Sequence, residues 1–204
     1  MGRLKEFDEE KAIDRAADCF WARGYEATSV RDLAAHMGIG GASLYNAYGG
    51  KRTLFAMALE RYANRSSRER IARFEATAQP RQAIEAFFAE IVDRSLKDRA
   101  RKGCLLVNSA LDVAPHDAEL GRVVAGYLEE IRAFFHRNIE AGRRTGQMPS
   151  SLDAVAVSAH LLGVLLGIRV LARTRPDRAL LENIARPALD LLTDGRSSPT
   201  RTKE

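Results

Sequence analysis

Apolar residues return every three or four positions along nearly the whole chain, and no stretch alternates strictly between apolar and polar residues. The first spacing is typical of an α-helix with one buried face, whereas strict alternation is typical of a β-strand. We therefore expect an all-α protein of about nine helices. The expected helices cover approximately residues 8–23, 29–37, 41–48, 51–62, 80–92, 103–114, 120–139, 150–172 and 177–191.

The segment from Thr28 to Lys51 contains two of these short helices, joined by a turn that includes Gly38. Ser29, followed three positions later by Asp32, is typical of a capped helix start. Two helices joined by a short glycine turn form a helix-turn-helix, whose second helix enters the major groove of DNA. The residues that we expect to contact DNA are Ser29, Arg31, Gly41, Ala42, Ser43, Tyr45, Asn46 and Lys51.

These candidates fall into three chemical groups. Those on the second helix are mostly small or hydrogen-bonding, which suits a helix that comes close to base edges. Lys51 opens the next helix, where its ammonium and the free backbone N–H groups can share one phosphate. Arg31 can reach a guanine or a phosphate. The alternatives are that Tyr45 packs in the core, that Arg31 is a solvated charge and that Asn46 makes no contact.

An ordered set of residues in this segment also matches a known family. The set consists of Gly24, Tyr25, Thr28, Ser29, Val30, Arg31, Asp32, Leu33, Ala34, Gly38, Ile39, Leu44, Tyr45, Tyr48, Lys51, Leu54 and Phe55. In this respect residues 8–62 resemble the TetR family of bacterial repressors. The chain departs from the family pattern at Gly40, where a serine is usual, and near Ala47, where an aromatic residue or histidine is common. Beyond residue 62, only the number and order of the helices agree.

The resemblance implies a repressor that binds a palindromic double-stranded DNA operator as a homodimer and is released by an effector, a small molecule not yet known. Family members dimerise through their last two long helices, here residues 152–193. The helix at 152–174 agrees, because it is apolar on more than one side and needs two partners. Gly163 and Gly167, four positions apart, would let a second helix approach closely. The alternative is that this helix is the central rod of a monomer.

Family members hold the effector between the middle helices. Aromatic residues with a few polar groups are typical of a mostly apolar ligand pocket. On this basis the candidate lining is Phe87, Phe88, Ile91, Cys104, Asn108, Tyr127, Phe134 and His160. Taken singly, most of these side chains fit a hydrophobic core equally well. Cys104 has a second interpretation as a reactive thiol, because it follows several cations at an expected helix start.

These patterns predict a helix-turn-helix DNA-binding domain over residues 1–50 and an effector-binding and dimerisation domain over residues 51–194. Residues 195–204 are polar and predict a disordered tail. The net charge of +5 favours a polyanionic partner. Acidic and basic side chains nearly balance within the first sixty residues, however, so DNA contacts there depend on local arrangement.

Several other classes of protein are disfavoured. The first ten residues are charged and contain no apolar segment, so we expect a cytoplasmic protein without a signal peptide. Polar residues interrupt the apolar run 154–172, so we expect no membrane span. Motifs for a phosphate loop, an activated serine or a metal are absent, so we expect no catalytic residue, no cofactor and no metal site. A constitutive DNA-binding protein without an effector and an all-helical enzyme remain the alternatives.

Overall fold

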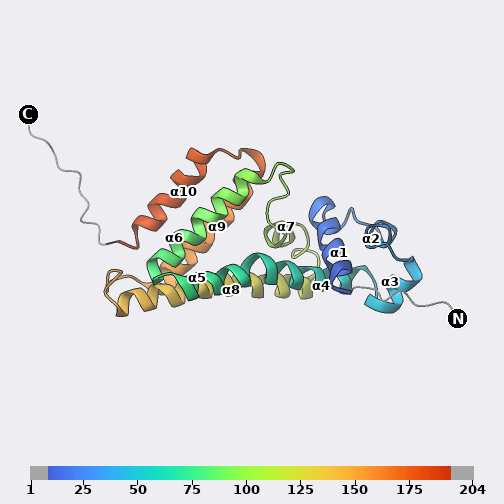
Figure 1. Cartoon of the computed structure of the whole chain (residues 1–204), viewed down its shortest axis with the longest axis horizontal. Helices are drawn as coiled ribbons and strands as arrows, with labels where there is room; N and C mark the ends of the chain where they lie inside the picture. Colours follow the sequence, from blue (N-terminus) through green and yellow to red (C-terminus); the bar gives the residue numbers. More distant parts are fainter. Residues whose placement is uncertain (1–8, 194–204) are drawn as a thin grey trace, which may run out of the picture. The chain divides into compact units, whose positions relative to one another are not determined.

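The computed structural model describes residues 9–193, and that range contains ten α-helices, one π-helical segment and no strand (Figure 1). The elements are α1 (Glu9–Arg23), α2 (Val30–Met37), α3 (Gly41–Tyr48), α4 (Lys51–Ala63), η1 (Asn64–Arg68), α5 (Glu69–Thr77), α6 (Pro80–Lys97), α7 (Leu105–Asp112), α8 (Ala118–Arg144), α9 (Ala154–Thr174) and α10 (Arg178–Asp190). Because α4, η1 and α5 follow one another directly, they correspond to one of the helices expected from the sequence. The all-α fold of about nine helices is therefore confirmed. The predicted tail, 195–204, lies outside the described residues.

The fourth helical segment is longer than its apolar spacing indicates. The sequence predicts an end near Tyr62, but helical structure continues through η1 to Thr77. Polar contacts take over where the apolar pattern fades. The guanidinium of Arg68 donates to the Glu60 carboxylate at 2.5 Å and to the Asn64 side chain at 2.7 Å. Helix α6 begins at Pro80, because a proline at the first helical position needs no backbone N–H partner.

The chain divides into two compact units. Unit 1 contains residues up to Glu69 together with Lys102–Leu128, and unit 2 contains Arg70–Arg101 together with residues from Glu129 onward. The division differs from a boundary at residue 50, because α4, α7 and the beginning of α8 pack with the first three helices. The predicted end of the DNA-binding domain at residue 50 concerns function rather than packing, and it stays a prediction.

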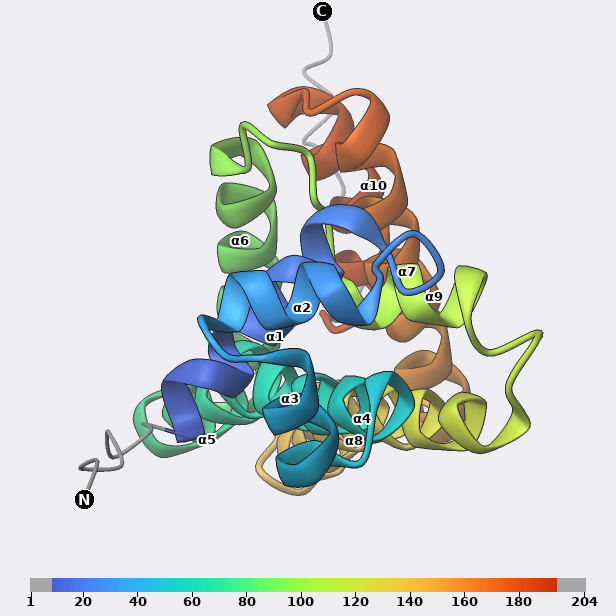
Figure 2. The ribbon, with the colours of Figure 1, turned by 90° about the vertical axis from the view of Figure 1, so that its right-hand side faces the viewer.

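In unit 1, α1 packs against α2 and α4, and α2 packs against α3 (Figure 2). Phe20 and Phe55 form the centre of this core, with their rings edge to face at 4.8 Å between centroids. Leu33 from α2 and Leu44 from α3 are fully buried in the same core, and Leu106 from α7 completes it. The helix-turn-helix therefore packs against one continuous apolar core, which fixes the position of α3 within unit 1.

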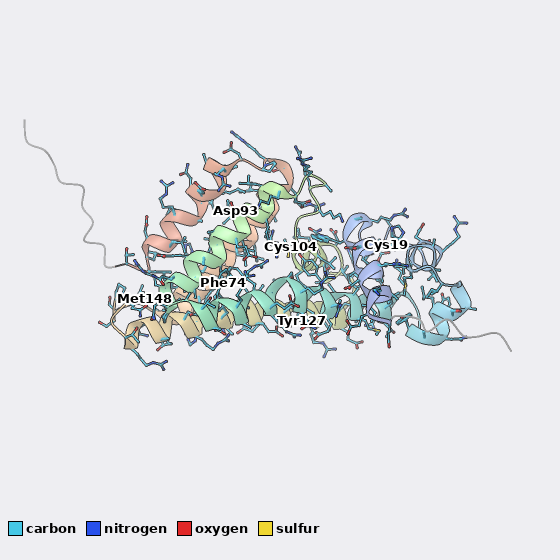
Figure 3. All side chains as sticks on the ribbon, viewed as in Figure 1. Cys19, Phe74, Asp93, Cys104, Tyr127 and Met148 are labelled. Carbon is cyan, nitrogen blue, oxygen red and sulfur yellow. The ribbon has the colours of Figure 1, made fainter. Side chains whose placement is uncertain are left out.

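In unit 2, α6, α9 and α10 lie side by side (Figure 1). Four aromatic rings, Phe87 and Phe88 from α6 and Phe134 and Phe135 from α8, form the centre of the core. Their centroids are 5.3 to 6.3 Å apart. Phe74, labelled in Figure 3, packs against this cluster from α5.

Candidate nucleic-acid interface

The start of α2 and the turn after it are built by local signals. The Ser29 hydroxyl accepts a hydrogen bond from the backbone N–H of Asp32 at 3.1 Å, and the Asp32 carboxylate accepts one from the Ser29 N–H at 3.0 Å. The hydrogen bonds from the Ser29 hydroxyl and N–H lower the pKa of Asp32 to about 2. Gly38 then ends α2 in the left-handed conformation, with φ of 72°. The predicted capping box is confirmed, and the Ser29 hydroxyl is part of it.

The face of α3 that points away from the core is open. Leu44 and Tyr48 are buried and hold the helix on unit 1. Tyr45 is 57% exposed, so its side chain is not a core residue. The other predicted contact residues on this helix are also exposed, and they are Gly41, Ala42, Ser43 and Asn46. Their small side chains leave the helix backbone accessible to a partner.

Lys51 is held at the start of α4 by two contacts. Its Nζ atom lies 4.2 Å from the centroid of the Tyr25 ring and 3.4 Å from the carbonyl oxygen of Glu26, to which it donates. No side chain of the described range caps α4, because its N-cap is Gly50, with φ of 116°. Within residues 9–193, the first backbone N–H groups of α4 therefore have no side-chain acceptor, and Lys51 is the first residue of the same helix. This arrangement suits a phosphate oxygen.

The next residue, Arg52, is a contrast to Lys51. Its guanidinium donates to the Asp117 carboxylate at 2.7 and 3.0 Å and to the Glu119 carboxylate at 2.8 Å. These hydrogen bonds raise the pKa of Arg52 and lower that of Asp117. Arg52 therefore connects α4 to the beginning of α8 within unit 1. Two adjacent cations thus have different surroundings, which the sequence alone does not separate.

Sequence reasoning missed the residues that position this surface. Tyr25 supplies the ring beneath Lys51 and packs against Phe55 at 4.6 Å between centroids. Arg15 on α1 donates to the carbonyl oxygen of Met37 at 3.3 Å and so fixes the end of α2. Tyr25 belongs to the family pattern, but its spacing gives no indication of a contact with a residue 26 positions later. Arg31 is exposed on α2, as a base- or phosphate-contacting residue must be.

The eight candidate effector residues lie in both units. Phe87, Phe88, Ile91 and Phe134 are buried in the core of unit 2, whereas His160 is exposed on α9. The other three belong to unit 1 and are half-buried, and they are Cys104, Asn108 and Tyr127. The phenol of Tyr127 donates to Glu60 at 2.6 Å, and the amide of Asn108 donates to the carbonyl oxygen of Lys102 at 2.9 Å.

Unit 2 also contains a groove of about 400 Å³ between α6 and α10. Phe88 and Val92 contribute to its apolar floor. At its rim the guanidinium of Arg178 bridges Asp93, at 2.8 Å, and Glu182, at 3.1 Å. Asp93 is labelled in Figure 3. The groove therefore lies on a different face of α6 from Phe87 and Ile91, so only one candidate effector residue lines it.

Two further properties concern residues 9–193 alone. No group of three or more His, Cys, Asp or Glu side chains in this range could hold a metal ion. One helix, α9, is long and apolar enough to cross a membrane by length and composition, with a mean hydropathy of 2.0. Only 33% of that stretch is buried. The core helix of a soluble protein meets the same criteria of length and composition.

The capped α2, the left-handed turn and the exposed α3 define a helix-turn-helix protein, a class that binds DNA. Residues 12–58 match the family model described as bacterial regulatory proteins of the tetR family, and residues 80–188 match that of the tetracyclin repressor-like C-terminal domain. The chain belongs to the TetR family of bacterial transcriptional regulators. The family prediction made from residues 8–62 is therefore confirmed, and the second match extends the likeness to most of the remaining chain.

Individual relatives cover nearly the whole chain. The uncharacterized HTH-type transcriptional regulator YezE of Bacillus subtilis is 33% identical over 94% of this chain and 100% of its own. The HTH-type transcriptional repressor ComR of Escherichia coli is 28% identical over 93% and 91% of the two chains. A cysteine mutant of the regulator CifR, solved in complex with a 26-base-pair operator DNA, is 30% identical with a TM-score of 0.83. It covers 94% of this chain and 100% of its own.

Proposed function

We propose that this regulator is a repressor that binds a palindromic operator as a homodimer and is released by a small-molecule effector. The observation that carries the proposal is the exposed face of α3 beside Lys51 and the uncapped start of α4. Base edges would meet the small residues of α3, and phosphates would meet Lys51 and the free N–H groups. The operator complex of CifR and the repressor name of ComR support the same function.

A homodimer is supported by the outer face of α9. Val155 is 62% exposed and Val170 is 42% exposed, although both are apolar. Between them lie Gly163 and Gly167, where an added Cβ would meet nothing within 4 Å. On α10 the apolar Leu180 and Ile184 are only partly buried. A second copy of the chain would cover these surfaces.

Binding of a palindrome can be tested with the full chain and a library of DNA duplexes. Selected sequences should contain two half-sites whose centres are about 34–36 Å apart, or a multiple of that distance. Asn46→Ala should reduce the preference for particular bases, since an asparagine commonly reads adenine in the major groove. Selection of no common sequence by the wild-type protein would refute specific operator binding.

The dimer can be tested by sedimentation. Gly163→Leu should place a large side chain where a partner helix comes closest, at an overpacking cost of roughly 1–3 kcal/mol, and shift the protein toward monomer. Gly126→Leu is the matched control, because Gly126 also lies inside a helix with open space around an added Cβ. A monomeric wild-type protein at micromolar concentration, or equal effects of the two variants, would argue against this interface.

Effector release distinguishes this proposal from constitutive DNA binding. A ligand that weakens operator binding must itself bind more weakly to the operator-bound protein, by a coupling of about 1–3 kcal/mol. A screen that measures protein melting temperature identifies binding compounds, and titration with and without operator then measures the coupling. Equal ligand affinity in the two titrations would favour a constitutive DNA-binding protein.

A further inference from the structure

Arg70 on α5 is a buried cation in unit 2. Its side chain is only 4% exposed, and its Nε donates to the Glu90 carboxylate at 2.9 Å. Its guanidinium carbon lies 5.4 Å from the centroid of the Phe87 ring. Nη2 is buried and has no hydrogen-bond partner among the described residues. An arginine in this position has a charged donor directed into the protein with no acceptor to receive it.

The charge around Arg70 is not balanced. Glu90 also binds Arg73 and Arg94, the latter at 3.5 Å, so one carboxylate serves three guanidinium groups. Burial lowers the pKa of Arg70, the hydrogen bond with Glu90 opposes that change, and the charges of Arg94 and Arg169 lower it further. The cluster therefore carries a net positive charge in a partly desolvated region.

Arg169 on α9 adds a second guanidinium with little compensation. Its Nη1 donates to the hydroxyl of Ser95 at 3.2 Å, and Ser95 is itself buried. No carboxylate within residues 9–193 forms an ion pair with Arg169. Ser95 follows Glu90 by five residues on α6, a rise of roughly 7.5 Å along the helix axis. Arg70 and Arg169 thus contact α6 from two other helices, at residues five positions apart, and the charge of Arg169 acts on Arg70.

A buried charged donor without an acceptor is costly, because it has lost its water and gained no hydrogen bond. A guanidinium fits a carboxylate better than other common groups, since its parallel N–H groups match the two oxygens. The ring of Phe87, 5.4 Å from the guanidinium carbon of Arg70, borders this cluster on its apolar side.

We propose that unit 2 contains an oxyanion site formed by Arg70 and Arg169, and that it binds a small carboxylate. The carboxylate would accept a hydrogen bond from the unpaired Nη2 of Arg70. Arg73 and Arg94, both about half exposed, would attract the anion at the surface. The identification of this carboxylate as the effector rests on the function proposed above, whereas the site itself does not.

The site can be tested by calorimetry on the full chain with two matched pairs of ligands. Benzoate and hexanoate carry the carboxylate, and benzamide and hexanamide have nearly the same shape without the charge. Each carboxylate should bind at least about tenfold more tightly than its amide, because only the anion satisfies Arg70. Inorganic phosphate distinguishes the carboxylate from a free phosphate as the occupant. Equal affinity for acid and amide, or preferred binding of phosphate, would overturn the proposal.

Variants connect binding to the named side chains. Arg70→Met should weaken benzoate binding by about tenfold or more and leave benzamide unchanged. The melting temperature should stay the same or rise, because Glu90 keeps Arg73 and Arg94 and the unpaired donor is removed. Arg81→Met is the matched control, since Arg81 is a surface arginine bound to Glu85 at 3.6 Å. Unchanged benzoate affinity in Arg70→Met would refute the site.

A second variant keeps the test decisive if Arg70→Met does not fold. Arg169→Gln removes only a contact to a hydroxyl, and it should weaken benzoate binding several-fold in a folded protein. Operator affinity measured with the same ligands separates the two proposals. Carboxylate binding without any change in operator affinity would support the site and refute its role in regulation. Release of operator by a neutral compound, with no carboxylate binding, would refute the site and support the proposed function.

Discussion

Lys51 and Arg52 provide a sharp test of the DNA interface, because two adjacent cations have different surroundings. Among residues 9–193, Lys51 contacts an aromatic ring and a backbone carbonyl, at 4.2 and 3.4 Å, and no carboxylate. Arg52 is bound by two carboxylates of the same unit, at 2.7 and 2.8 Å. Of these two cations, Lys51 is therefore the one whose charge no carboxylate of the described range compensates. We expect Lys51→Met to change the salt dependence of DNA binding and Arg52→Met to leave it unchanged.

The magnitude follows from counterion release. One phosphate contact contributes a slope of roughly 0.9 to the plot of log affinity against log salt concentration. Over a fourfold range of salt, the wild-type protein should therefore lose about 3.5-fold more affinity than Lys51→Met. Methionine keeps most of the apolar stem over Tyr25, so the lost attraction to the ring should cost only about 0.5–1 kcal/mol of stability. The loss of affinity should be similar on operator and on unrelated DNA.

The measurement is fluorescence anisotropy with labelled operator from 50 to 200 mM salt, together with thermal unfolding of each variant. Arg52→Met should lower the melting temperature by releasing Asp117 and Glu119 while its salt slope stays equal to that of the wild type. Equal salt slopes for Lys51→Met and the wild type would show that Lys51 does not contact a phosphate. A reduced salt slope for Arg52→Met would show that the ion pairs of Arg52 open when DNA binds. In that case the carboxylates around Arg52 would not keep it from contacting a phosphate.

Three other predictions test individual contacts. Ser29→Ala removes the cap of α2 and should destabilise the fold by about 1 kcal/mol in urea unfolding. Tyr127→Phe removes the hydrogen bond that contributes most to lowering the pKa of Glu60. It should cost about 1 kcal/mol near neutral pH, and the difference from wild type should narrow as pH falls and Glu60 protonates. Cys104 is half-buried at the N-cap of α7, whereas Cys19 is fully buried and burial raises its pKa (Figure 3). Cys104 should therefore react with iodoacetamide at least about tenfold faster, and equal rates would contradict this.

The fold of the first fifty residues could be predicted because its signals are local. Glycines at 24, 38 and 49 adopt left-handed conformations and end the first three helices. The cap at Ser29 needs only Asp32, three residues away. The continuation of α4 into η1 and α5 could not be predicted from apolar spacing. It depends on polar contacts such as that between Arg68 and Glu60, which ordinary surface charges do not reveal.

The same distinction applies to the DNA interface. Exposure of Tyr45 and Asn46 follows from the helical spacing of Leu44 and Tyr48, so the outward face of α3 could be recognised from sequence. The choice between Lys51 and Arg52 could not. Arg52 is paired with Asp117, 65 residues later in the chain, and no local pattern encodes that contact.

The candidate effector residues show what a selection by residue type leaves open. Aromatic residues and a few polar groups describe a ligand pocket and a hydrophobic core equally well. Selection on that basis found Phe87 and Phe134, which are core residues, and passed over Arg70, which lies in a run of charges typical of a solvated helix face. A buried hydrogen-bond donor without a partner is rarer in proteins than a buried aromatic ring, so it is the more specific sign of a binding site. The unpaired Nη2 of Arg70 therefore indicates the kind of ligand more specifically than the apolar residues around it do.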